Sequence, residues 1–202
     1  LGGLLFGVDT GIINGSITYM ASPEQLNLSP YEEGLVTSGI TLGAAFGAVI
    51  IGRLSDIYGR KKTLWALSVV FLVTTLACSL APNAPLMILF RFLLGLAVGG
   101  VSVIVPTYLS EIAAKELRGR IVTHNEFMIT TGQLLAFVVN AVLGNLFPDM
   151  TSIWRYMIAF GMIPSILLFI GMFRVPESPR WEIMRGREDS ARKILASVRS
   201  SD

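Results

Sequence analysis

Three ionisable residues lie inside long apolar stretches of this chain: Asp9, Arg91 and Glu126. If these stretches cross a membrane, each charge costs several kcal/mol unless it is paired or hydrated, so each residue is a candidate functional group. Asp9 and Arg91 carry opposite charges, and they would form a buried ion pair if their segments were neighbours. Separating such a pair favours protonation of the carboxylate, because an unpartnered buried charge is unfavourable. The sequence therefore predicts a proton-binding group at Asp9 with Arg91 as its partner; a static ion pair is the alternative.

A second set of polar residues follows a helical period. Thr123, Glu126, Thr130, Gln133 and Asn140 recur at intervals of three, four, three and seven residues, which places them on one face of a helix. Polar groups are unfavourable against lipid, so this face is expected either to line a wet cavity or to bond a neighbouring helix. A polyhydroxylated ligand would suit the face, because each ligand hydroxyl both donates and accepts a hydrogen bond. Glu126, Gln133, Thr130 and Asn140 are thus predicted to bind substrate.

The composition excludes several classes of protein. With 52% hydrophobic and 15% charged residues, the chain is too apolar for an ordinary soluble domain and is typical of a membrane protein. Cys78 and His124 are the only residues of their types, so no metal site, disulfide framework or other cofactor is expected. The polar face offers no nucleophile with a base, so an enzyme is disfavoured. No basic face with interleaved aromatics occurs, and no nucleic-acid partner is expected.

Charge-free runs long enough to cross a bilayer predict the elements that position these groups. Six membrane helices are expected, and they are separated by short polar turns. Their predicted ranges are 1–20, 31–52, 63–81, 86–108, 121–147 and 154–174. In the first two, glycines recur four residues apart at Gly3, Gly7, Gly11 and Gly15, and at Gly39, Gly43 and Gly47, a spacing that predicts helix-packing seams.

The distribution of cations predicts the orientation. Fourteen of the sixteen Lys and Arg residues fall in the turns 53–62 and 115–120 or in the segment from Arg174 onward, and none falls in the opposite connections. Because Lys and Arg are retained on the cytoplasmic side, both visible ends are predicted to be cytoplasmic in a multi-pass protein of the plasma membrane.

The chain divides into two parts at the end of the last apolar run. Residues 1–174 are predicted to form the six-helix transmembrane bundle, and residues 175–202 a cytoplasmic amphipathic segment with one helix over 181–198. The segment is read as a solvated helix packing on loops, with a gate at the membrane surface as the alternative. The chain starts inside an apolar run at Leu1 without a Met, so it is expected to be an excerpt of a longer protein.

The turn between the second and third runs resembles a family signature. Gly52, Asp56, Gly59, Arg60 and Lys61 match G-x-x-x-D-x-x-G-R-[KR]. Further motifs follow in the same order as in the family: Arg91-Phe92-Leu93-Leu94-Gly95, then Pro106-Thr107-Tyr108-Leu109-Ser110-Glu111 with Arg118-Gly119-Arg120, and then Pro176-Glu177-Ser178-Pro179-Arg180. Over nearly its whole length the chain resembles the amino-terminal half of a sugar porter of the major facilitator superfamily.

This resemblance implies an all-α membrane protein, with six transmembrane helices as one half of a major facilitator fold plus a cytoplasmic amphipathic helix. It implies a sugar or polyol as substrate, the proton as coupling ion, and as partners the lipid bilayer and a carboxyl-terminal six-helix half, without which alternating access is not expected. It also implies a cytoplasmic charge network that latches the outward-open state, formed by Asp56, Arg60, Lys61, Glu111, Arg118, Glu177 and Arg180.

The resemblance also bears on mechanism and substrate. Proton symporters of the family have an acid at the position of Asp9 facing the arginine at Arg91, and many relatives have a sugar-binding glutamine where this chain has Glu126, with another at Gln133. The Asn125-Glu126 pair is most similar to bacterial myo-inositol symporters. The implied function is sugar or cyclitol symport with protons, with myo-inositol as the single best candidate. A facilitative or proton-coupled hexose or pentose transporter and a non-transporting sugar sensor are the alternatives.

Overall fold

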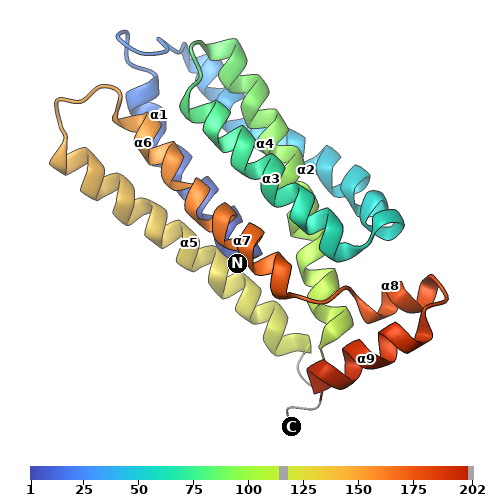
Figure 1. The fold of residues 1–202 in the computed structure, drawn as a ribbon. Helices are drawn as coiled ribbons and strands as arrows, with labels where there is room; N and C mark the ends of the chain where they lie inside the picture. The colour runs from blue at the N-terminus through green and yellow to red at the C-terminus, as the bar shows by residue number, and fades with distance from the viewer. Residues whose placement is uncertain (114–117, 200–202) are drawn as a thin grey trace.

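The computed structural model describes residues 1–113 and 118–199, with side chains for 1–113 and 119–197. Every regular element in this part of the chain is a helix, and the long helices lie side by side in one bundle (Figure 1). The helices are α1 (Gly2–Met20), α2 (Pro30–Tyr58), α3 (Arg60–Ser79), α4 (Ala84–Ile112), α5 (Arg118–Leu146), α6 (Ile153–Phe160), α7 (Met162–Arg174), α8 (Pro179–Met184) and α9 (Glu188–Arg199).

The predicted six-span architecture is confirmed. Five segments of the described chain are long and apolar enough to cross a membrane: Pro30–Tyr58, Arg60–Ser79, Ala84–Ile112, Gly119–Leu146 and Ile153–Arg174. The sixth helix of the bundle is α1, whose 19 residues span about 28 Å at ~1.5 Å per residue. Bulky apolar side chains such as Phe71, Met87 and Trp154 fill the core between the helices.

The basic turn is tighter than predicted. We expected the second span to end at Gly52, but α2 continues to Tyr58, because its glycines keep helical dihedral angles until Gly59 adopts a positive φ. Gly59 alone joins α2 to α3, and its φ of 101° is a conformation that favours glycine. We call the end of the bundle that carries Arg53, Arg60, Lys61, Lys62 and Arg120 the basic end.

The last span is interrupted, where a continuous helix was predicted over 154–174. The break lies at Gly161, between α6 and α7. Pro164 has no N–H to donate to the carbonyl of Phe160, and its ring crowds the same turn, so the helix tightens there. The N–H of Gly161 accordingly bonds the carbonyl of Ile158 at 2.9 Å.

The segment after the bundle also differs from the prediction of one helix over 181–198. It forms two short helices, α8 and α9, at the basic end (Figure 1). Gly186, with a φ of 73°, turns the chain between them. Trp181 of α8 is buried, and its Nε1 donates to the carbonyl of Asp56 at 3.0 Å. The segment is therefore docked on the end of α2.

The helices pack in close pairs, α2 along α4 and α1 along α5. Both contacts use the predicted glycine seams. A Cβ atom on Gly43 would overlap the carbonyl oxygen of Phe92, and one on Gly7 would overlap that of Ile129. Backbone therefore touches backbone along each seam, which larger residues would prevent.

The opposite end of the bundle is held by a ring of polar contacts. Arg155 donates to the carbonyls of Ser79 at 2.8 Å and Ala81 at 3.2 Å, and so satisfies groups that the end of α3 leaves free. Trp154 donates through Nε1 to the side chain of Gln25 at 3.0 Å. These bonds fix the loop after α1 and the end of α3 against the start of α6.

Candidate functional site

The structure brings Asp9 and Arg91 together in the middle of the bundle. Asp9 lies on α1 and Arg91 on α4, and Nη1 of Arg91 donates to Oδ1 of Asp9 at 3.0 Å. Both residues are buried, with 7% and 1% of their surfaces exposed. The predicted contact is therefore present. An ion pair so far from water interacts strongly, and its loss would leave two costly charges.

This pair is held by a single hydrogen bond. Oδ2 of Asp9 and the Nε and Nη2 groups of Arg91 are buried and find no partner among the described protein groups. A guanidinium and a carboxylate often form two parallel bonds, and this pair does not. The carboxylate thus keeps one oxygen on which a proton can bind without displacing the bond to Arg91.

The polar face of α5 is divided between two roles. Glu126 and Thr130 are exposed, and Gln133 is half-buried. Thr130 donates its hydroxyl proton within its own helix, to the carbonyls of Glu126 at 3.1 Å and Phe127 at 3.0 Å. The carboxylate of Glu126 and the amide of Gln133 are therefore the groups of this face that are best placed to bind a ligand.

Asn140 has a different environment from the other residues of this face. It is 8% exposed, and its Nδ2 donates to the carbonyls of Gly11 at 3.1 Å and Ile12 at 3.2 Å on α1. This is the bond to a neighbouring helix that the pattern left open as an alternative. The side chain of Asn140 thus joins α5 to α1, and its Oδ1 is buried and without a partner among the described groups.

Two further polar residues were missed in the sequence. Thr10 and Asn14 of α1 are accessible, and they lie on either side of Gly11, which packs on the backbone of Gln133. Thr10, Asn14 and Thr18 recur every four residues, a signal obscured by the glycines that share the segment. Thr10 donates to the carbonyl of Phe6 at 2.8 Å and Asn14 to that of Thr10 at 3.2 Å, so the two residues add accessible polar surface on α1.

Three residues of the predicted charge network meet at the basic end around Arg60. Its Nη1 lies 2.7 Å from Oδ1 of Asp56, and its Nε and Nη2 each donate to the carboxylate of Glu111 at 3.2 Å. Because the guanidinium is buried and binds Glu111 through two parallel bonds, it links the end of α2 to the end of α4.

The remaining residues of the predicted network fall into three groups. Glu177 accepts from the backbone N–H of Lys61 at 2.9 Å, whereas the side chain of Lys61 forms no ion pair with a described residue. Ser178, which was not predicted, donates to the carboxylate of Glu111 and caps α8. Arg180 is exposed and forms no ion pair with any described residue. The side chain of Arg118 lies outside the described part of the chain.

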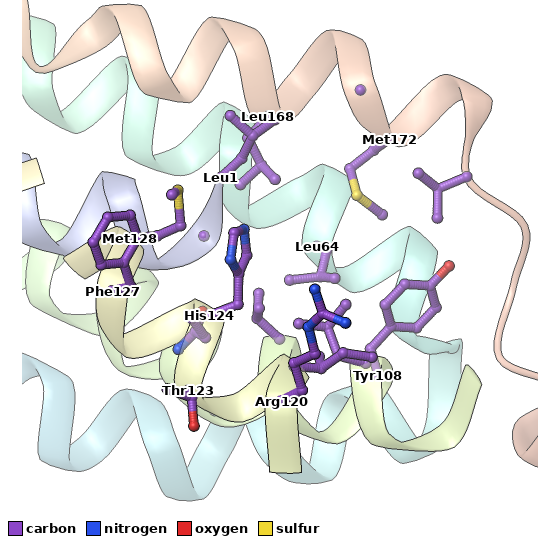
Figure 2. A pocket seen from close by; sticks show the side chains of 17 residues that line it. Leu1, Leu64, Tyr108, Arg120, Thr123, His124, Phe127, Met128, Leu168 and Met172 are labelled. Atoms are coloured by element: carbon purple, nitrogen blue, oxygen red, sulfur yellow. The ribbon is translucent and has the colours of Figure 1, made fainter. Parts of the chain in front are cut away.

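A cavity of about 980 Å³ lies elsewhere. Apolar side chains of α3, α4, α5 and α7 form most of its wall, with the first residue of the chain, Leu1. Figure 2 shows Arg120 and His124 on the α5 side of this space and Tyr108 on the α4 side. Glu126, Thr130 and Gln133 do not line it, so we do not assign it to a sugar. Among the described residues, no group of His, Cys, Asp and Glu could hold a metal ion.

Comparison with known proteins gives consistent matches. The family model "Sugar (and other) transporter" matches residues 1–202. The chain is 52% identical to the major myo-inositol transporter IolT of Bacillus subtilis, over 98% of this chain and 42% of that protein. It is 40% identical to a D-xylose transporter of Levilactobacillus brevis, over 100% of this chain and 43% of that protein. The chain thus spans about two fifths of the length of these relatives. They are transporters, in agreement with the expectation that this is not an enzyme.

A solved structure matches the fold as well. The structure of the proton:xylose symporter XylE bound to 6-bromo-6-deoxy-D-glucose aligns with a TM-score of 0.89 and 30% identity, covering 98% of this chain and 47% of that one. The bundle described above therefore corresponds to half of that fold.

Proposed function

Because the chain belongs to the sugar transporter family of the major facilitator superfamily, we propose that the whole protein is a proton-coupled symporter of sugars or cyclitols, with myo-inositol as its substrate. The observation that carries the proposal is the buried ion pair between Asp9 and Arg91. Of the relatives, IolT is a myo-inositol transporter and XylE is a proton:xylose symporter, which supports both parts of the proposal.

In this mechanism the proton binds at Asp9. Protonation removes the negative charge, so the ion pair that holds α1 to Arg91 weakens to a hydrogen bond between a charged guanidinium and a neutral carboxylic acid. The two helices can then move relative to each other when the two halves of the transporter rock about a central site. Release of the proton restores the ion pair and resets the carrier. The proton is the coupling ion, and the step requires no cofactor.

The ligand is held by the polar surface of α5 in this proposal. Glu126 and Gln133 accept and donate hydrogen bonds to the hydroxyls of the cyclitol, with Thr130 and Asn140 in supporting positions. The second half of the protein completes the site. The basic end faces the cytoplasm of a cell whose plasma membrane the bundle spans, because Lys and Arg are retained on that side.

Uptake by the full-length protein in proteoliposomes tests the function. We expect labelled myo-inositol to accumulate when the outside is acidic, and a protonophore to abolish the accumulation. Substrate uptake that reaches equilibrium without accumulation and is insensitive to the protonophore would instead indicate facilitated diffusion.

Competition by glucose, xylose and other polyols identifies the substrate. Unlabelled myo-inositol should compete best, and a stronger effect of xylose or glucose would contradict the assignment.

The substitution Gln133→Ala tests the ligand site. We expect the KM for myo-inositol to rise about fivefold to about 150-fold, because a lost hydrogen bond to a buried ligand costs about 1 to 3 kcal/mol. Initial rates of uptake across a substrate series provide the measurement. Thr131→Val is the matched control, since Thr131 lies off the polar face and bonds the carbonyl of Phe127. An unchanged KM for every polyol would remove Gln133 from the site.

A further inference from the structure

A second cavity of about 650 Å³ lies between the end of α2, the start of α3 and the end of α7. Apolar side chains line it along most of its length, among them Leu54, Leu67, Val70 and Met172. It is open to the surface, because Trp65, Ala66 and Val70 on its wall are themselves exposed. The cavity is therefore a groove on the outside of the bundle, away from the polar face of α5.

The surfaces that border the groove are apolar and exposed. On α3 they include Trp65, Val70 and Val73, and on α7 Ile166, Ile170 and Phe173. Trp65 packs against Phe169 and Phe173, with ring centroids 5.4 Å and 6.4 Å apart. In a helix pair that crosses a membrane, such outward apolar faces are the surfaces that touch lipid, and tryptophan marks the level of the headgroups.

The groove ends at two cations. Lys61 and Lys62 form part of its lining at the start of α3. The ammonium group of Lys61 is 3.5 Å from the carbonyl of Phe173, and Lys62 is exposed. The nearby Glu177 bonds the backbone N–H of Lys61, and neither lysine side chain forms an ion pair with a described residue. The positive charges at this end are thus available to an anionic group.

We propose that this groove binds an anionic phospholipid. One acyl chain lies along the apolar wall between α3 and α7, and the phosphate lies against Lys61 and Lys62 at the basic end. Charge complementarity selects this occupant: the cations are at the one end of the groove where the headgroup of a lipid in the cytoplasmic leaflet would lie. The bound lipid would also bridge α3 and α7.

The test uses the full-length protein in detergent, with bound lipid counted by native mass spectrometry. Phosphatidylglycerol is the probe and phosphatidylcholine the zwitterionic reference. We expect one phosphatidylglycerol to be retained in preference to phosphatidylcholine. Lys62→Gln should weaken its retention about fivefold, the order expected for one lysine at an anionic membrane surface, whereas Lys62→Arg should retain it. Ala66→Trp fills the groove and keeps both lysines, and it should abolish retention of the lipid.

Arg53→Gln is the matched control, because Arg53 is an exposed cation of the basic end that does not line the groove. It should bind phosphatidylglycerol as the unmodified protein does. Thermal unfolding of each variant without added lipid verifies folding. Equal retention of the two lipids, no effect of Lys62→Gln and Ala66→Trp in folded protein, or an equal loss in Arg53→Gln would overturn the proposal. Displacement of the lipid by glycerol 3-phosphate alone would also overturn it, since a headgroup without acyl chains would then suffice.

Discussion

Replacing Asp9 with asparagine should abolish accumulation of substrate against a gradient in the full-length protein and leave exchange of substrate across the membrane intact. Asparagine has nearly the shape of aspartic acid, and its amide oxygen can still accept the hydrogen bond from Arg91. Asparagine cannot bind or release a proton in the range of physiological pH, so the variant permanently resembles the carrier in which Asp9 is protonated. Movement of the loaded carrier is therefore retained, whereas its coupling to the proton gradient is lost.

Two assays on the same proteoliposomes separate these outcomes. Accumulation is measured with an inward proton gradient, and exchange is measured as counterflow between labelled and unlabelled substrate. Glu24→Gln is the matched control, since Glu24 is an exposed acid in the loop after α1. Undiminished accumulation in Asp9→Asn would refute the coupling role. Loss of both activities in a folded protein would show instead that the ion pair is structural.

Folding must be verified for this variant, because removing one partner of a buried ion pair costs about 3 to 5 kcal/mol in proteins. The cost should be smaller here, since the amide still accepts the bond from Arg91. A thermal unfolding curve in detergent provides the measurement. A folded variant that exchanges substrate establishes that the loss of accumulation arises from the missing proton site.

The Asp9–Arg91 contact could be predicted because few alternatives exist for a charge inside an apolar run. One acid and one base of comparable depth must pair within the bundle, since lipid offers neither a partner. The spans could be predicted for a similar reason, because the lengths of the charge-free runs match the thickness of a bilayer. Both inferences depend on the cost of moving charged groups from water into lipid, and that cost follows directly from the residue types.

The remaining features depend on local geometry that the pattern of polarity does not report. Asn140 shares a helical face with Gln133, but only the close approach of α1 at Gly15 and Gly11 turns its amide into a link between helices. The breaks at Gly161 and Gly186 arise where a missing N–H or a left-handed residue interrupts a helix of otherwise suitable composition. Arg180 matched a motif, yet its position on α8 leaves it exposed.

The glycine seam between α2 and α4 gives the second large effect, and here the structure separates residues that the sequence treats alike. Gly39, Gly43 and Gly47 share one face at intervals of four residues. A Cβ atom at Gly39 would lie 3.6 Å from the carbonyl oxygen of Ile88, an ordinary contact, whereas at Gly43 or Gly47 it would overlap the carbonyl oxygen of Phe92 or Leu96. The same substitution is therefore expected to have opposite effects along one seam.

Gly43→Ala and Gly47→Ala should each destabilise the protein by about 3 kcal/mol, because the added methyl group meets rigid backbone and the two helices must separate along their contact. Gly39→Ala should be neutral or stabilise the protein by up to about 1 kcal/mol, since alanine favours the helix more than glycine does. Gly34→Ala is the control for helix propensity alone, because no atom lies within 4 Å of its Cβ position. Unfolding midpoints of the full-length variants provide the measurement. Equal effects at Gly39 and Gly43 would show that α2 and α4 are not in backbone contact. The position of α4, which brings Arg91 next to Asp9, would then need a different explanation.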